Sequence, residues 1–371
     1  MTIQLLGGMS YAAFFRDYWQ KKPLLVRNAI PEFAGLIDPE ALFKLSANEN
    51  AVSRLVYQKD AAWQLQHGPF KRKDFNPTRV GTSWTLLVQE LNHHLRGAEQ
   101  LLQQFDFIPH ARLDDLMVSY ATPGGGVGPH FDSYDVFLIQ GKGSRCWQIS
   151  SQSNLELIAG LPLKILQNFV AEEEWILAPG DMLYLPPHYA HNGIAVDECM
   201  TYSVGFRAPS AQEMSTQFLV YLQDKIALPG QYADPDLTWQ IHPAEITQAM
   251  VTKIAGMIEQ IQWTRHDIAD FIGRYFSEPK AHVFFSFPKR PVSADTFRSQ
   301  VMADGLRLAP QSQMLFYEER YYLNGESVEL PPCTALQILA DTRQMSGPIR
   351  EDCWGWFYQG YLDGYFLIDR D

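Results

Sequence analysis

GGGVGPHFD, residues 124–132, is the stretch of sequence that decides the fold and the chemistry of this chain. Side chains two residues apart in a strand point to the same face, so His130 and Asp132 can reach one metal ion together. A second histidine, His191, follows in LPPHYAHNG, residues 185–193. Two imidazoles and one carboxylate on one face of an octahedral Fe(II) leave three positions open. We therefore predict that His130, Asp132 and His191 are metal ligands and form the catalytic centre.

Two alternatives qualify this assignment. An H-x-D triplet occurs by chance in many proteins, and His130 alone would read as a surface histidine beside a turn. His188 competes with His191 for the third position. His188 follows two prolines directly, which predicts a tight turn and a side chain at the solvent or the pocket rim. His191 stands where the next strand is expected to begin, so a sheet can aim its side chain, and we favour His191.

The region from Leu116 to Phe206 has the pattern of an antiparallel barrel or sandwich. Short apolar runs are separated by Gly, Pro, Asn and Asp, with no helical pattern between them. The runs are MVSYAT, DVFLIQ, RCWQIS, EEWILA, DMLYLP, NGIAV and MTYSVGF. The tight turns expected at residues 141–143 and 179–181 agree with this arrangement.

The residues before this region mix helices and strands. Aromatic residues at helical spacing predict a helix from Tyr11 to Trp19, followed by a strand over Leu24–Val26. A short helix is expected over Pro39–Leu45 and a hairpin over Ser53–Leu65. Trp84, Leu87, Leu91 and Leu95 lie on one helical face, which predicts a long helix from roughly Ser83 to Phe105.

Helical pattern returns after Pro209 and changes again near Pro279, which suggests two domain boundaries. Three helices are expected within residues 211–226, 242–261 and 264–276. The last part should contain a helix over residues 293–303, two strands flanking Asn324-Gly325, and two more helices.

Composition excludes some classes of protein. The 371 residues are 46% hydrophobic, which is ample for a sizeable core, and no run of about 18 apolar residues predicts a membrane span. The N-terminus lacks the pattern of a signal peptide. The net charge of -12 disfavours direct binding to phosphate backbones. The cysteines, which form no C-x-x-C pair, predict reduced thiols and a cytoplasmic protein; they are Cys146, Cys199, Cys333 and Cys353.

Several segments together resemble the JmjC-type ribosomal oxygenases. They are YWQKKPLLVRNA (residues 18–29), GPHFDSYDVFLIQGKGSRCWQI (128–149), PGDMLYLPPHYAHNG (179–193) and MTYSVGFRAP (200–209). The resemblance is strong over residues 1–209 and concerns the order of elements beyond them. It is closest to the bacterial members, which hydroxylate an arginine of the sixteenth large-subunit ribosomal protein.

The resemblance implies an α+β chain in three parts. Residues 1–209 would form the JmjC domain, a double-stranded β-helix of the cupin type whose core barrel covers about 110–209. Residues 210–278 would form a helical dimerisation domain, and residues 279–371 a winged-helix-like domain. The expected activity is an Fe(II)- and 2-oxoglutarate-dependent dioxygenase that hydroxylates the β-carbon of an arginine in a basic ribosomal protein and releases succinate and CO2.

The co-substrate 2-oxoglutarate needs a cation for its distal carboxylate. Arg145, on the strand after the 141–143 turn, can grip a carboxylate with two parallel bonds, and the bacterial relatives carry arginine where many JmjC relatives carry lysine. Only one of Ser119 and Tyr120 faces inward on its strand. The bacterial relatives favour Ser119 near 2-oxoglutarate, human relatives favour a tyrosine nearer Tyr120, and Ser203 is a weaker candidate.

The substrate pocket of an arginine hydroxylase should hold a cationic side chain. Tyr134 and Asp135 follow the H-x-D triplet and are expected as walls of that pocket, because an aromatic face and a carboxylate suit a guanidinium. Each could equally be a barrel residue with its own partners. A histidine target, a lysine demethylase and a non-catalytic cupin that binds a small molecule remain alternatives.

The remaining expectations concern partners. Apolar stripes such as Phe218 to Leu222, and Ile246, Met250, Ile254 and Ile258, could pack on the barrel or join two copies, and the resemblance favours a homodimer through residues 210–275. Residues 293–371 carry 12 acidic residues against 6 arginines and no lysine. That balance lacks the basic footprint of a DNA-binding domain, so no direct DNA binding is expected.

Overall fold

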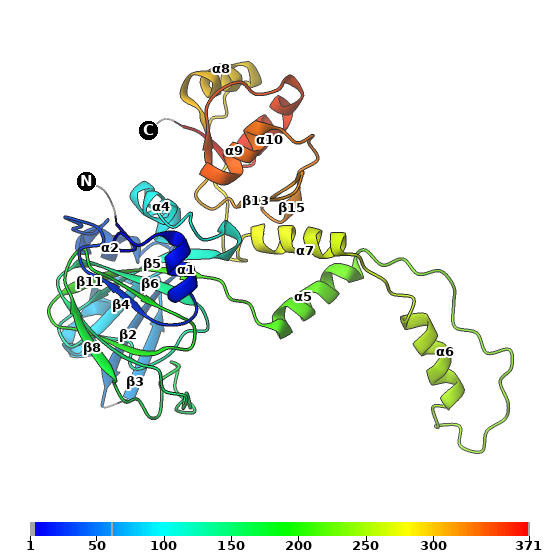
Figure 1. The fold of residues 1–371 in the computed structure, drawn as a ribbon, viewed down its shortest axis with the longest axis horizontal. Coiled ribbons are helices and arrows are strands. Elements are labelled where there is room, and N and C mark those ends of the chain that lie inside the picture. The colour runs from blue at the N-terminus through cyan, green and yellow to red at the C-terminus, as the bar shows by residue number, and fades with distance from the viewer. Residues whose placement is uncertain (1–3, 61, 370–371) are drawn as a thin grey trace.

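Residues 4–369, apart from residue 61, are described by a computed structural model. The first half of the chain is a β-barrel, the middle is a helical arm, and the last part is a smaller mixed domain beside α4 of the barrel (Figure 1). The predicted α+β class is therefore confirmed.

The barrel is built from two antiparallel sheets. In the described residues the larger sheet has eight strands in the order β1-β9-β6-β11-β5-β4-β2-β3, and the smaller sheet has the order β10-β7-β8. The strands of the larger sheet are β1 (Leu24–Val26), β2 (Ser53–Lys59), β3 (Ala62–His67), β4 (Trp84–Val88), β5 (Leu113–Ala121), β6 (Asp135–Lys142), β9 (Met182–Leu185) and β11 (Cys199–Phe206). Those of the smaller sheet are β7 (Arg145–Ser150), β8 (Glu173–Leu177) and β10 (Ala190–Ala195).

The strand order confirms the double-stranded β-helix. The chain passes back and forth between the sheets: β6 is followed by β7 and β8 in the smaller sheet, β9 lies in the larger, β10 in the smaller and β11 in the larger again. Side chains of both sheets meet in an apolar cluster that includes Val136, Leu138, Trp147 and Leu183. Because successive residues of a strand face opposite ways, each of these strands sends one row of side chains into the barrel.

The outer face of the larger sheet is covered by the N-terminal helices. They are α1 (Tyr11–Asp17), α2 (Pro39–Leu45), α3 (Pro77–Val80) and α4 (Arg96–Gln103). Ser10 and Asp38 cap α1 and α2, each accepting a backbone N–H of the first turn. Phe14 of α1 is fully buried against Phe137 and Tyr184 of the sheet. This packing leaves the inner face of the sheet free to line a cavity.

The long helix predicted from Ser83 to Phe105 is wrong. Trp84–Val88 is strand β4, paired between β2 and β5 with all five residues buried. A 3-10 turn over Leu91–His93 leads to the shorter α4. The spacing of Trp84, Leu87 and Leu91 suits a helix. A central strand that is buried on both faces can also be apolar at consecutive positions, and β4 is such a strand.

The helical arm follows the barrel. It consists of α5 (Ala211–Gln223), α6 (Gln248–Ile258) and α7 (Arg265–Ser277). Figure 1 shows α6 at the end of a long loop, away from the rest of the chain. No residue of α6, which is described in full, is buried. Among the described residues no helix has the length and apolar character to cross a membrane.

The C-terminal domain has its own apolar core, formed by residues such as Phe297, Leu336, Phe357 and Phe366. Helix α7 packs on the hairpin of this domain formed by residues 314–323. The contact is so close that a Cβ at Gly273 would lie 2.3 Å from the Tyr322 ring. The elements are α8 (Ala294–Asp304), β12 (Leu306–Leu308), β13 (Met314–Tyr317), β14 (Arg320–Leu323), β15 (Glu326–Ser327), α9 (Thr334–Thr342), β16 (Gln344–Met345), α10 (Trp354–Leu362) and β17 (Phe366–Ile368).

Ion pairs join this domain to the barrel. Glu99 of α4 is buried and lies within 3.5 Å of guanidinium nitrogens of Arg96, Arg307 and Arg343. Asp369 pairs with Arg96 and Arg307 in turn. A buried carboxylate that loses its cations is strongly destabilising, so this network fixes the C-terminal domain against α4.

Candidate metal centre

The histidines and the aspartate lie on two neighbouring segments of the chain that are joined by backbone hydrogen bonds. His130 and His191 exchange both backbone hydrogen bonds, at 2.9 and 2.8 Å, in an isolated antiparallel bridge. The segment carrying His130 and Asp132 is thus extended but is not the regular strand that we predicted. Just before it, a Cβ at Gly126 would lie 2.5 Å from the Gly193 carbonyl oxygen. The glycine-rich approach lets the two backbones come this close.

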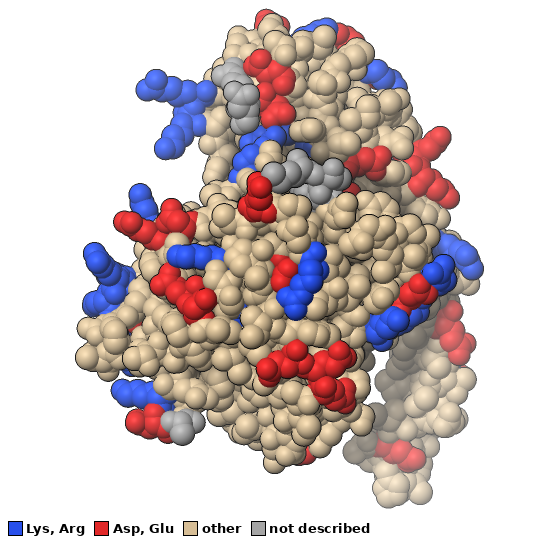
Figure 2. Space-filling view, turned by 60° about the vertical axis from the view of Figure 1, so that its left-hand side comes forward, with Lys and Arg blue, Asp and Glu red and all other residues tan. Residues whose placement is uncertain are grey.

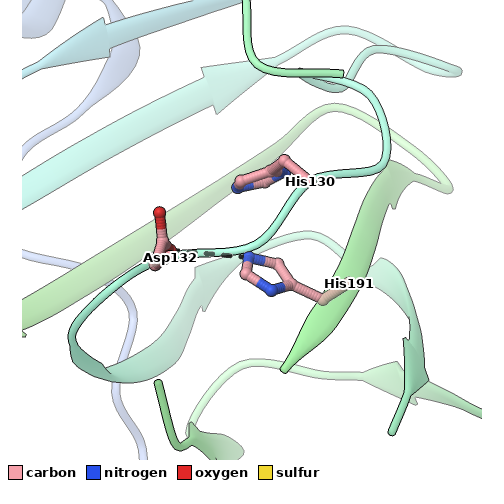
Figure 3. A group of neighbouring side chains, drawn as sticks. All are labelled: His130, Asp132 and His191. Carbon is pink, nitrogen blue, oxygen red and sulfur yellow. Dashed lines mark ion pairs between the residues drawn. The ribbon is translucent and has the colours of Figure 1, made fainter. Parts of the chain in front are cut away.

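Three side chains converge beside this bridge (Figure 3). One ligand atom from each of His130, Asp132 and His191 lies within 4.8 Å of the other two. Oδ2 of Asp132 is 3.7 Å from Nε2 of His191. The imidazole rings of the two histidines are 4.2 Å apart between centroids. The structure therefore brings together the three residues that the sequence singled out.

The outer nitrogen of each ring has a backbone partner. Nδ1 of His130 lies 2.9 Å from the Gly128 carbonyl oxygen, and Nδ1 of His191 lies 2.9 Å from that of Tyr189. A carbonyl oxygen only accepts, so each Nδ1 carries the hydrogen and Nε2 of the neutral ring is a free electron-pair donor. Burial, together with the neighbouring His130, lowers the pKa of His191 to about 4, which keeps this ring neutral.

His188 stands outside the group. Its side chain is exposed and its backbone has a φ of 62°, in the turn that the two prolines predict. Its backbone N–H donates to the carbonyl oxygen of Asp132 at 2.7 Å, and its ring lies beside Phe131. His188 therefore shapes the loop that carries Asp132 and points its imidazole elsewhere.

A cavity of about 440 Å³ opens from this group into the barrel. Arg145 of β7 lies in its wall and is buried. One guanidinium nitrogen lies 3.3 Å from Oγ of Ser119, while Nε and the other terminal nitrogen have no partner. A buried guanidinium whose N–H groups lack hydrogen-bond partners destabilises the protein, so this end of the cavity suits an anionic ligand.

Three further polar atoms in the cavity wall are also buried without hydrogen-bond partners. They are Nε of Arg54, Oγ1 of Thr85 and Nε1 of Trp147. Sequence reasoning missed all three residues. Thr85 lay inside the wrongly predicted helix. The signal that could have revealed it is that Thr85 is a polar residue within the apolar run Trp84–Val88. Trp147 lies two residues beyond Arg145 on β7 and therefore faces the same way.

The strand β5 settles which of two neighbouring residues faces the cavity. Ser119 lines it, whereas Tyr120 points to the other face and packs against Phe43 and Trp84. Ser203 of β11 also lines the cavity. Of the three hydroxyl residues considered from sequence, Ser119 alone contacts Arg145.

The opposite end of the cavity is acidic. Asp114, Asp115 and Tyr134 line it. Burial raises the pKa of Asp115 to about 6, with Lys280 opposing and Asp114 adding to the rise. Burial and the carboxylates of Asp132 and Asp115 raise the pKa of the Tyr134 phenol, which stays protonated. Tyr134 is thus a wall of the cavity, as predicted.

The prediction that Asp135 is a wall of the pocket is wrong. Asp135 is fully buried on the other face of β6. Its carboxylate accepts hydrogen bonds from Gln20, Tyr184 and Arg112 at 2.7 to 3.1 Å. Side chains alternate along a strand, so Asp135 points away from the cavity. The carboxylates that line the cavity here, Asp114 and Asp115, belong to β5 instead.

Comparison with known proteins places the chain in a family. Residues 100–214 match the model of a JmjC domain, and residues 259–353 match a ROXA-like winged helix. The ribosomal protein uL16 3-hydroxylase of Escherichia coli (strain K12) is 33% identical, over 90% of this chain and 89% of its own length. The chain belongs to the JmjC-domain ribosomal oxygenases.

Other ribosomal oxygenases agree with this placement. A probable ribosomal oxygenase of Haemophilus influenzae is 40% identical, over 84% of this chain and 80% of its own. The X-ray structure of E. coli YcfD, 31% identical, superposes with a TM-score of 0.86 and covers 99% of this chain and all of its own. YcfD has also been solved with cobalt and 2-oxoglutarate, at a TM-score of 0.82 over 97% of this chain. The winged helix that resemblance implied is confirmed.

Proposed function

We propose that this protein is an Fe(II)- and 2-oxoglutarate-dependent hydroxylase that acts on the β-carbon of an arginine in a large-subunit ribosomal protein. One observation carries the proposal. A group of three metal-ligand side chains lines one cavity together with a buried arginine that has unpartnered nitrogens and a pair of carboxylates. The relatives support it, because YcfD binds cobalt with 2-oxoglutarate or with succinic acid, and a homologue is named a uL16 3-hydroxylase.

His130, Asp132 and His191 would hold Fe(II), with cobalt as its substitute in the YcfD structures. The two free Nε2 atoms and the carboxylate form the donor set that non-haem Fe(II) oxygenases use. The backbone acceptors at Gly128 and Tyr189 keep both rings in the tautomer that this role needs. When bound, Fe(II) supplies the activation of dioxygen that couples loss of CO2 from 2-oxoglutarate to hydroxylation of the substrate.

Arg145 would bind the distal carboxylate of 2-oxoglutarate. Two of its guanidinium nitrogens are unpartnered, and two parallel N–H groups match a carboxylate. Ser119 touches the third nitrogen and would share the same ligand. The buried polar atoms of Thr85 and Trp147 lie in the same wall, and a ligand rich in oxygen atoms would supply acceptors for them.

Asp115, Asp114 and Tyr134 would receive the substrate side chain. A guanidinium pairs with a carboxylate and stacks on an aromatic ring, and both features stand at this end of the cavity. Arginine is favoured over histidine as the target, because two carboxylates suit a permanently charged group. The protein's own contribution is to hold the substrate carbon beside the metal and to exclude water.

The test is to incubate the purified protein with Fe(II), 2-oxoglutarate and uL16 from the same organism. We expect succinate release that depends on uL16, and a gain of one oxygen atom on an arginine by tandem mass spectrometry. A gain on a histidine would move the activity to the histidine hydroxylases of the family. Loss of methyl groups from a methylated lysine peptide would make the protein a demethylase. Binding of 2-oxoglutarate without any succinate would make it a non-catalytic binding protein.

The proposal includes a homodimer joined through residues 210–275. The stripe of α6 could have packed on the barrel, but Met250, Ile254 and Ile258 are 37%, 37% and 59% exposed in the single chain. Trp239, in the loop before α6, is 85% exposed. Such apolar surface is typical of an interface. Light scattering should give twice the mass of one chain, and Ile254→Asp should lower it to one; a wild-type mass of one chain would refute the dimer.

The C-terminal domain is proposed not to bind DNA, and the protein is proposed to work in the cytoplasm on its ribosomal partner. On the face shown in Figure 2, Lys and Arg are scattered among acidic residues without a continuous basic stripe. Arg298 and Arg350 of the domain are paired with Glu351 and Asp352. A gel-shift assay with duplex DNA should show no binding at low salt. Salt-sensitive binding would contradict this expectation.

A further inference from the structure

The linker between α7 and α8 places one cation, Lys280, against a carboxylate of the cavity wall. Nζ of Lys280 lies 2.9 Å from Oδ1 of Asp114 and 3.2 Å from Oε1 of Glu90. Its side chain is 30% exposed, so most of it is covered. Burial opposes its charge, but Asp115, Asp114 and Glu90 raise the pKa of Lys280, which stays protonated. A residue near the C-terminal domain therefore takes part in the electrostatics of the barrel.

Glu90 is the second member of this arrangement. It is buried, and its carboxylate also meets His282 of the linker at 2.9 Å and His93 at 3.5 Å. Its backbone has a φ of 54°, a conformation that costs energy for a residue with a side chain. The contacts of the carboxylate hold that conformation in place. In it, the backbone N–H of Glu90 donates to Oδ2 of Asp115 at 3.0 Å.

Asp115 is the member that has no direct ion pair, although the charge of Lys280 opposes the rise in its pKa. No ion pair joins it to a lysine or arginine in the described part of the chain, whereas Asp114 pairs with both Lys280 and Arg207. The chain thus pairs Asp114 and Glu90 directly with cations and leaves Asp115 buried, oriented by one N–H, facing the cavity and acted on by Lys280 without a direct ion pair. An unmatched buried carboxylate is costly, and a cationic ligand would remove that cost.

We propose that Lys280 is a positioning residue for the cationic substrate. It holds Glu90 and Asp114, and the backbone N–H of Glu90 in turn orients Asp115 toward the incoming side chain. This inference rests on the proposed function, since it names the group that the substrate arginine meets. It also assigns a role to the linker before the C-terminal domain, because Lys280 of that linker contacts Asp114 of the cavity wall.

The experiment compares Lys280→Met, which keeps the length of the side chain and removes its charge, with Lys280→Arg, which keeps the charge. The control is Lys142→Met, because Lys142 pairs with the carboxylate of Glu198 but lies on the surface, whereas Lys280 pairs with two carboxylates and is mostly covered. Steady-state succinate release is measured while uL16 and 2-oxoglutarate are varied separately. We expect the KM for uL16 to rise about tenfold in Lys280→Met and less than threefold in Lys280→Arg and in the control, with the KM for 2-oxoglutarate unchanged.

A double-mutant cycle with Asp115→Asn shows whether Lys280 acts through Asp115. In the Asp115→Asn background, Lys280→Met should add less than a twofold change in the KM for uL16. Independent, multiplied effects would overturn the proposal, as would an equal rise of both KM values in Lys280→Met. If Lys280→Met does not fold, as judged by its melting temperature, Lys280→Gln replaces it in the same cycle. Failure of the proposed function itself looks different, because the wild type would then release no succinate in response to uL16.

Discussion

The two ends of the cavity are opposites. At one end Arg145 is buried with two unpartnered guanidinium nitrogens, and at the other Asp115 is buried without a direct ion pair among the described residues. Asp115 and Ser119, which touches Arg145, stand on the same face of β5 four residues apart, or about 13 Å. At that distance the two charges attract each other by only about 1 kcal/mol with an effective dielectric of 20.

The difference teaches how one cavity can recognise two ligands at once. A protein that needed these charges for stability would have let them meet, since close pairing offsets the cost of burial. Here the rigid strand holds them apart, and the His130, Asp132 and His191 group lines the same cavity. Each end is therefore free to bind a ligand of opposite charge, and each should be separable by mutation.

Mutation of a metal ligand should have the largest effect on turnover. His130→Ala, Asp132→Ala or His191→Ala should lower succinate release by roughly 1,000-fold or more, because a two-ligand iron site loses its facial geometry. The matched variant is His188→Ala, whose exposed ring should leave turnover within roughly threefold of wild type. Iron content and melting temperature are measured alongside. A dead His188→Ala beside an active His191→Ala would reverse our choice of histidine.

The cationic end comes next. Arg145→Ala removes a charge-assisted pair and leaves a carboxylate unmatched in the cavity, so the KM for 2-oxoglutarate should rise by roughly 100-fold. The KM for uL16 should change little in the same variant. Arg16→Ala, at an exposed arginine, serves as the control. An unchanged KM for 2-oxoglutarate would place the distal anchor elsewhere and would remove one half of the comparison.

A mutation at the acidic end should raise the KM for uL16 and not that for 2-oxoglutarate, and by a smaller factor. Asp115→Asn should raise the KM for uL16 by roughly tenfold, because Asp114 remains nearby to attract the substrate. The KM for 2-oxoglutarate is expected to stay within twofold of wild type. Asp135→Asn is not a suitable control, since its carboxylate holds Arg112 and Tyr184 in the core. If both KM values rose together, the two ends would not be independent.

The smallest effect is a dependence on pH. Because the pKa of Asp115 is raised to about 6, its charge is lost as the pH falls through 6 instead of near the ordinary value of about 4. Binding of a uL16 peptide, measured by calorimetry, should therefore weaken severalfold between pH 7.5 and pH 5.5. Asp115→Asn has no charge to lose and should show a flatter profile. Parallel profiles in the two proteins would assign the pH dependence to another group.

The comparison also explains what sequence could and could not reveal. His130 and Asp132 stand two apart and Arg145 follows a recognisable turn, so short-range spacing was enough to find them. Asp115 and Thr85 were missed because their roles depend on neighbours from other strands. The apolar spacing around Trp84 suits a helix, and only pairing with β2 and β5 makes this segment a strand. Asp135 was misplaced because a local pattern does not show which face of a strand looks inward.

The buried network of Glu99 with Arg96, Arg307 and Arg343 has a consequence for the integrity of the chain. The network joins residues that precede the exposed loop at residues 227–246 to residues that follow it. A hydrogen bond from Tyr221 to Asp270 also joins the chain before this loop to the chain after it. A protease that cut the loop would leave two fragments already docked through contacts that need no covalent link. The nicked protein should therefore elute as one species and come apart only under denaturing conditions, as a complex of complementing fragments does.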